Sequence, residues 1–134
     1  MTKITEIEGI GGQYAEKLAA VDIGTTETLL KKGATPQGRA EIAEMTGISG
    51  TLILKWVNRA DLFRIKGIGE EYADLLEVAG VDTVPELARR NPDNLHQALE
   101  STNEEKHLVR QTPSQSQVSS WVEMAKTLDR VITY

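Results

Sequence analysis

The amino-acid sequence contains one segment twice, and this repetition limits the possible folds more than any other feature. Residues 7–18 read Ile-Glu-Gly-Ile-Gly-Gly-Gln-Tyr-Ala-Glu-Lys-Leu and return at residues 65–76 as Ile-Lys-Gly-Ile-Gly-Glu-Glu-Tyr-Ala-Asp-Leu-Leu. Nine of 24 positions are identical between residues 7–30 and 65–88, at a constant offset of 58. A long period that occurs only twice is typical of a tandem duplication rather than of a solenoid.

A second match, at an offset of 65, extends the repetition toward the end of the chain. Trp56 and Val57 correspond to Trp121 and Val122. The change of offset requires seven extra residues in the second copy, in or near the polar stretch 101–106. No linker rich in Pro, Gly or Ser separates the copies. The sequence therefore predicts two units, residues 1–62 and 63–134, that pack together.

The apolar residues of both copies follow a helical period. Tyr14, Leu18 and Val21 lie at i, i+4 and i+7, which is one face of a helix. We therefore expect an all-α fold with helices of about 8–12 residues, in which Trp56 and Trp121 belong to the core. A stacking platform for single-stranded nucleic acid is the alternative interpretation of the two tryptophans. The same helical spacing recurs at residues 53–60, 72–79 and 118–125.

Several polar residues mark where these helices begin. Thr83-Val84-Pro85-Glu86 predicts a capping box, and Asn91-Pro92 predicts a second helix start. The stretch 111–120 is the most polar in the chain, so we expect it to be the least ordered.

Each copy has the triplet Gly-Ile-Gly just before a predicted helix, at residues 9–11 and 67–69. Glycine permits a positive φ and a close approach of two backbones, so the triplet predicts a tight reversal between short helices. We expect the central residues, Ile10 and Ile68, to be buried. The amides that open the next helix lack partners within it and favour an anion.

The pattern apolar-x-Gly-Ile-Gly-x-x-x-Ala-x-x-Leu, found at residues 7–18 and 65–76, resembles the hairpin of the helix-hairpin-helix family. Residues 46–49, Thr-Gly-Ile-Ser, resemble a degenerate second hairpin, and residues 112–114 would be their counterpart. The resemblance implies two tandem helix-hairpin-helix (SAM-like) units. Nearly the full chain also resembles a bacterial domain-of-unknown-function family built from such units.

In the helix-hairpin-helix family the hairpin amides hold a DNA phosphate without reading sequence. In the second copy Glu70 and Glu71 stand where a phosphate would lie and would oppose it, so we interpret Gly67 and Gly69 as structural. The alternative for both copies is that Gly-Ile-Gly only forms the turn. The candidate nucleic-acid site that the resemblance implies in the first copy consists of Gly9, Gly11, Gly12, Gln13 and Lys17.

The charge of the chain weighs against a strong nucleic-acid binder. The 134 residues carry a formal net charge of −5, with a pI near 5.1, which also argues against a polybasic membrane patch. Residues 1–62 contain seven basic and eight acidic side chains, a net charge of −1. Residues 63–134 contain eight basic and twelve acidic side chains, a net charge of −4.

The residue types exclude several classes of chemistry. The lack of cysteine excludes disulfides, thiolate metal sites and cysteine nucleophiles. His96 and His107 lack the spacing of metal ligands, so we expect neither a metal nor a cofactor. Gly-Ile-Gly lacks the Lys-Ser/Thr of a P-loop, and no nucleophile is paired with a base, so we expect no enzyme. With no spanning-length apolar run and no signal-peptide pattern, we expect a cytoplasmic protein without membrane contact.

Residues 39–49, followed by Ile53 and Trp56, also fit a helix-turn-helix motif. Arg, Asn and Gln carry most of the discrimination between bases, and the predicted reading helix contains few of these residues. The predicted reading helix, residues 50–60, would present Thr51, Lys55, Asn58 and Arg59.

Two functions from different classes remain open. The first is a non-enzymatic protein-protein interaction or self-association module, which needs an exposed apolar patch of several hundred Å². The second is weak, sequence-independent binding of duplex DNA through the hairpin amides of the first unit. The DNA function needs basic side chains gathered beside residues 9–13. The side chains that would have to gather there are Lys3, Lys17, Lys31, Lys32, Lys55 and Arg59.

Overall fold

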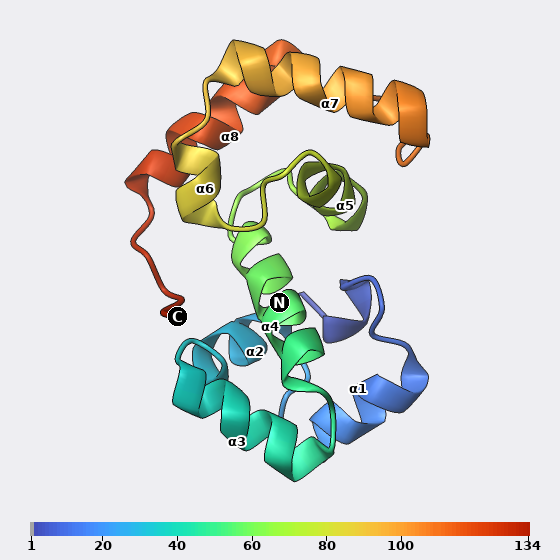
Figure 1. Cartoon of the computed structure of the whole chain (residues 1–134), viewed down its shortest axis with the longest axis vertical. Helices are drawn as coiled ribbons and strands as arrows, with labels where there is room; N and C mark the ends of the chain where they lie inside the picture. The colour runs from blue at the N-terminus through green and yellow to red at the C-terminus, as the bar shows by residue number, and fades with distance from the viewer. Residues whose placement is uncertain (1) are drawn as a thin grey trace. The chain divides into compact units, whose positions relative to one another are not determined.

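The computed structural model describes residues 2–134, and these residues form helices joined by short turns (Figure 1). No strand occurs among them, and Lys3 and Thr25 form an isolated β-bridge. The predicted all-α fold class is therefore confirmed. The helical elements of the described residues are η1 (Ile4–Glu6), α1 (Gly12–Ala19), α2 (Thr26–Lys32), α3 (Pro36–Thr46), α4 (Gly50–Leu62), α5 (Glu70–Val78), α6 (Val84–Ala88), α7 (Pro92–Lys106) and α8 (Gln115–Thr127).

The helices belong to two compact units. The second unit is the continuous stretch Leu62–Arg130. The first unit runs to Asp61 and also includes the last four residues, Val131–Tyr134. These four residues, which the division drawn from the sequence assigns to the second unit, thus lie in the first.

Most helices begin at a polar side chain that accepts a hydrogen bond from the first turn, which satisfies one of the otherwise unpaired backbone amides. Thr25, Thr35 and Asn91 accept from the backbone N–H three residues ahead, at 3.2, 3.0 and 3.0 Å. Ser114 forms a full capping box, because its side chain accepts from Gln117 N–H and its own N–H donates to the Gln117 side chain. The predicted helix start at Asn91 is confirmed.

Two local predictions are wrong. Thr83 does precede α6, but its hydroxyl donates to the Glu86 carboxylate at 3.1 Å instead of accepting a backbone N–H. The polar stretch expected to be the least ordered contains the start of α8, because Ser114 and Gln117 supply the capping box. Polar residues at this point stabilise a helix terminus rather than weaken the structure.

The apolar residues placed on helical faces by the sequence pattern form the cores. Trp56 is 1% exposed and Trp121 is 2% exposed, so both predicted core positions are confirmed. The second unit has one apolar cluster, in which α8 packs on α6 and α7, and α5 packs on α7. In the first unit the buried apolar side chains are Ile4, Ile7, Ile10, Leu18, Ile23, Leu29, Leu30, Ile42, Ile48, Ile53, Trp56, Val57, Ala60 and Ile132.

Two glycines near the turn from α2 into α3 permit close packing, Gly33 against α4 and Gly38 against the end of α2. A Cβ added to Gly33 would lie 2.5 Å from Val57 Cγ2. A Cβ added to Gly38, in the first turn of α3, would lie far inside contact distance of the backbone carbonyl oxygen of Lys32. The turn from α2 into α3 therefore has no room for a side chain at either position.

None of the helices in residues 2–134 has both the length and the apolar character that a membrane crossing requires.

Candidate binding surfaces

The first Gly-Ile-Gly turn has the geometry that the sequence predicts. Gly9 has a φ of +94°, a left-handed conformation that favours glycine. Ile10 is 4% exposed and its N–H donates to Ile7 C=O at 3.1 Å, so its predicted burial is confirmed. Gly11 is the residue before α1, and the first backbone hydrogen bond of this helix joins Ala15 N–H to Gly11 C=O at 2.9 Å.

The turn of the second unit repeats these features 58 residues later. Gly67 has a φ of +97°, Ile68 is 4% exposed, and Ile68 N–H donates to Ile65 C=O at 3.2 Å. Gly69 precedes α5, whose first backbone bond joins Ala73 N–H to Gly69 C=O at 2.9 Å. Burial of Ile68 is therefore confirmed as well.

The first glycine of each turn packs against the tryptophan of its own unit. A Cβ added to Gly9 would lie 3.4 Å from Trp56 Nε1, and one added to Gly67 would lie 3.1 Å from Trp121 Nε1. Each indole also contacts a tyrosine ring that follows the turn, with centroids 5.1 Å apart in the first unit and 5.3 Å in the second. Gly9 and Gly67 therefore have packing roles in addition to any role toward a ligand.

The later part of the first turn is open. No described atom lies within 4 Å of a Cβ added to Gly11 or Gly12. The amides of Gly12, Gln13 and Tyr14 precede the first intrahelical bond, so they have no acceptor within α1. Gln13 and Lys17 are exposed, and Lys17 Nζ lies 5.9 Å from the centre of the Tyr14 ring. The structure therefore places three of the five predicted site residues, Gly11, Gly12 and Gln13, at the open start of α1. Lys17 lies in the last turn of this helix, and Gly9 packs toward the indole.

The same open space exists in the second unit, but acidic side chains flank it. No described atom lies within 4 Å of a Cβ added to Gly69. Glu70 and Glu71 are exposed in the first turn of α5. Carboxylates at a helix N-terminus stabilise the helix through its dipole, and they also repel an external anion. The two turns thus share a backbone geometry and differ in charge.

The predicted reading helix of a helix-turn-helix motif does not present its polar residues together. Residues 50–62 form α4, and Thr51 and Lys55 are exposed on it. Arg59 is 5% exposed, so it is part of the interior of the protein. Asn58 accepts a hydrogen bond from the Tyr134 hydroxyl at 2.8 Å. The expectation that Arg59 faces a base edge is therefore wrong.

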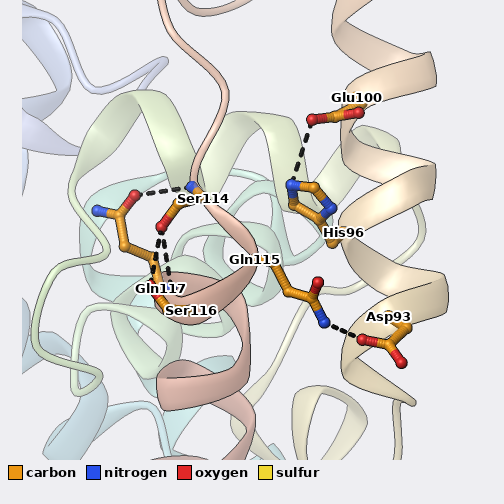
Figure 2. Close-up of polar contacts among 7 residues, drawn as sticks. All are labelled: Asp93, His96, Glu100, Ser114, Gln115, Ser116 and Gln117. Carbon is orange, nitrogen blue, oxygen red and sulfur yellow. Dashed lines mark hydrogen bonds and ion pairs between the residues drawn. The ribbon is translucent and has the colours of Figure 1, made fainter.

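Figure 2 shows polar contacts within α7, at the start of α8, and between the two helices. His96 points to Glu100, one turn along its own helix, with Nε2 and Oε1 3.2 Å apart. The Gln115 amide donates to the Asp93 carboxylate. Ser114 is engaged in the capping box of α8. These contacts cap one helix and tie it to its neighbour, and they direct His96 to a carboxylate rather than to a serine.

The first unit also contains a non-helical segment that no sequence pattern marked as part of a site. We call Val131–Tyr134 the closing segment. Thr133 N–H donates to Ala34 C=O at 2.8 Å, and the Tyr134 hydroxyl donates to Asn58. Ile132, which precedes Thr133, is 3% exposed.

Arg39 provides the charged contact to this segment. One guanidinium nitrogen donates to Gly33 C=O at 2.9 Å, and another donates to Thr133 C=O at 2.8 Å. The Tyr134 ring lies over the same guanidinium, 5.6 Å from ring centre to Cζ. Arg39 itself is 8% exposed. A buried arginine fixed by its own unit thus contacts both the backbone and the aromatic ring of the closing segment.

Little in the sequence distinguishes this site. Residues 128–134 follow the part of the second copy that matches the first and have no counterpart there, which is the one visible signal. A shallow hollow of about 320 Å³ lies nearby along α3, lined by Lys32, Gly38, Glu41, Ile42 and Met45. No cluster of three or more metal-ligating side chains occurs among residues 2–134.

Residues 8–128 match the family described as "Domain of unknown function (DUF4332)". Comparison with curated proteins gives no significant match, and comparison with solved structures gives none either.

Proposed function

The chain belongs to the DUF4332 family, and we propose that it is a non-enzymatic protein-interaction module of the helix-hairpin-helix type, made by internal duplication and acting in the cytoplasm. Three features that recur at an offset of 58 support the duplication: a positive-φ glycine, a buried isoleucine, and an indole against the glycine. The helix-hairpin-helix assignment is supported by the short turn that leads directly into α1 and α5.

One observation carries the interaction function: the first unit binds a polypeptide segment that is distant in sequence. The closing segment is about one hundred residues from its partner Ala34 along the chain. It is held by a backbone hydrogen bond, an apolar side chain and two side-chain contacts. Backbone bonds with side chains that fix the register are the elements of peptide recognition.

The chemistry of this site suits a peptide better than a small molecule. Burial of an isoleucine side chain contributes about 1.5–3 kcal/mol, and each hydrogen bond adds about 0.5–1.5 kcal/mol. Arg39 is already oriented by Gly33 C=O, so little side-chain entropy is lost when it binds a carbonyl. The same site on a second copy could take the segment in exchange, which would give self-association.

The first test releases the closing segment from the site by a substitution and adds the same segment as a separate peptide. Thr133→Pro removes the N–H that donates to Ala34 C=O, so the closing segment of this variant should dissociate. We expect the variant to bind a fluorescent peptide of residues 128–134, blocked at both ends, with a Kd of about 10⁻⁴ M, which corresponds to the middle of the summed energies of one buried isoleucine and three hydrogen bonds. Fluorescence polarisation measures the affinity.

Two modified peptides serve as controls and leave the protein unchanged. A peptide methylated on the Thr133 nitrogen cannot donate to Ala34 and should bind at least about 5-fold more weakly, as expected for one lost hydrogen bond. A peptide with Phe in place of Tyr134 loses the Asn58 contact and should bind moderately more weakly. No binding to the folded variant would contradict the proposed function, and gel filtration of the same sample reports self-association.

Duplex DNA binding by the first unit is the second candidate, and the open start of α1 favours it. Gly11 and Gly12 leave space for an approaching group, and the amides behind them favour an anion. Lys17 lies one turn further on. The other basic side chains do not all contribute, because Arg59 is buried and Lys32 Nζ donates to Val21 C=O at 3.0 Å.

We expect any DNA binding to be weak, about 10⁻⁴–10⁻⁶ M, independent of sequence, and to weaken steeply with salt. Gly12→Asp should abolish it, because the carboxylate would stand at the phosphate position. Replacement of Glu70 and Glu71 by lysine should strengthen DNA binding, because positive side chains would then flank the second turn in place of carboxylates. Retardation of duplex DNA at about 50 mM salt is the measurement, where electrostatic binding is favoured.

Gly12→Ala is the matched control, because it fills the same open space without charge and should leave any DNA affinity within about 2-fold. If the wild-type protein does not retard DNA at this salt concentration and the lysine variant does not either, the DNA candidate is wrong.

A further inference from the structure

We infer that the closing segment Val131–Tyr134 regulates the binding site of the first unit by occupying it, and that a partner must present a similar segment to displace it. This inference rests on the proposed interaction function. The occupied state is the one the structure shows, with Ile132 buried and Thr133 bonded in both directions to the first unit.

The covalent connection of the closing segment makes it a strong competitor. Only Leu128–Arg130 separate it from the end of α8 at Thr127. Within the second unit, Leu128 packs against the apolar cluster and Asp129 C=O accepts from the Arg64 guanidinium at 2.8 Å. A short tether of this kind gives an effective concentration on the order of millimolar.

The contacts specify the chemistry of the partner. The buried position of Ile132 requires a branched aliphatic side chain. The next residue must have a free backbone N–H for Ala34 and a carbonyl for Arg39, which excludes proline. The residue after that is best an aromatic with a hydroxyl, which contacts both the Arg39 guanidinium and Asn58. The partner is thus a non-helical segment of the pattern aliphatic, any residue except proline, tyrosine.

Competition sets the size of the expected effect. A segment whose own affinity is about 10⁻⁴ M, present at an effective concentration of about 10⁻³ M, weakens the binding of an external peptide about 10-fold. Wild-type protein should therefore bind the 128–134 peptide about 10-fold more weakly than Thr133→Pro does.

A reversible disulfide provides a test that leaves the backbone contacts in place. The chain has no cysteine, so the double variant Ala34→Cys, Thr133→Cys contains a single pair, and the Thr133–Ala34 hydrogen bond brings the two residues together. When oxidised, this variant should bind no peptide up to about 1 mM. After reduction it should bind the peptide again, with an affinity similar to that of the single cysteine variants. Each single cysteine variant is a control for the substitutions.

Each outcome separates the inference from the function on which it rests. If neither the reduced variant nor Thr133→Pro binds the peptide, the proposed interaction function is wrong. If both bind it and the oxidised variant binds equally well, the peptide occupies a different site and the inference is wrong. The inference is also wrong if the cysteine pair cannot be oxidised in the folded protein. If Thr133→Pro fails to fold, the comparison of the oxidised and reduced forms of the double cysteine variant decides whether the inference is correct.

Discussion

Replacement of Trp56 or Trp121 by alanine should lower the free energy of unfolding by roughly 3–5 kcal/mol, as for other buried large aromatics. Each indole is almost fully buried, contacts a tyrosine ring at a steep angle, and packs against the glycine of its turn. The loss is a large part of the roughly 5–15 kcal/mol that stabilises a typical domain. Denaturant titration followed by circular dichroism measures it.

The two tryptophans also allow the units to be observed separately. The chain contains one tryptophan in each unit, so in Trp56→Ala the fluorescence of Trp121 reports the second unit alone. If the units unfold independently, the fluorescence midpoint of this variant should match that of Trp56→Phe, in which Trp121 is also the one remaining tryptophan. The circular dichroism signal of the first unit should be lost earlier in Trp56→Ala. Trp56→Phe, which keeps a ring beside Tyr14, should lose less. Unchanged midpoints for both alanine variants would show that the indoles are not core residues.

Gly38→Ala should destabilise the first unit by about 1–3 kcal/mol, in the range of other overpacking substitutions. The added methyl group meets the carbonyl oxygen of Lys32, and a backbone atom cannot move aside by changing rotamer. The turn between α2 and α3 would have to open. The orientation of Arg39, one residue further along the chain, would change with it. The denaturation midpoint of the first unit is the quantity to compare.

Gly12→Ala and Gly50→Ala are matched controls for this substitution. Both glycines lie at the start of a helix, and no described atom lies within 4 Å of an added Cβ. Alanine has the higher helix propensity, by up to about 1 kcal/mol, so these variants should be as stable as the wild-type protein or slightly more stable. A Gly38→Ala variant that behaved like them would contradict the close approach of α2 and α3.

The features that the sequence predicted correctly depend on local periodicity and local chemistry. Helical spacing placed Trp56 and Trp121 in the cores, and the glycine triplets predicted the buried Ile10 and Ile68. The side chain of Asn91 caps α7 because capping needs only residues that are three positions apart. Such signals are contained in a few consecutive residues, so they can be read without the fold.

The errors have a common cause, which is that neighbours distant in sequence decide the outcome. Arg59 looks like a surface cation on a helix, yet the fold buries it. Gly33 and Gly38 look like ordinary turn residues until it is known that Val57 packs against the first and the Lys32 carbonyl against the second. The closing segment has few polar features of its own, and its partner Ala34 is a residue that no pattern would single out.

The candidate site was predicted in part. The open amides at the start of α1 follow from the glycine triplet and the helix that comes after it. The proposed peptide site on the same unit could not be predicted, because the Arg39 contacts depend on the positions of Gly33 C=O and Thr133 C=O, which are 6 and 94 residues away.

The first unit is completed by residues that follow the whole second unit in the sequence, and this order has a consequence for synthesis on the ribosome. At about 5–20 residues per second, translation of the intervening Leu62–Arg130 takes several seconds. During that time the nascent first unit has helices but lacks Ile132, so the apolar surface that this side chain covers is open to chaperones and to other nascent chains. A fusion partner joined after Tyr134 would act on the last step of folding of the N-terminal half.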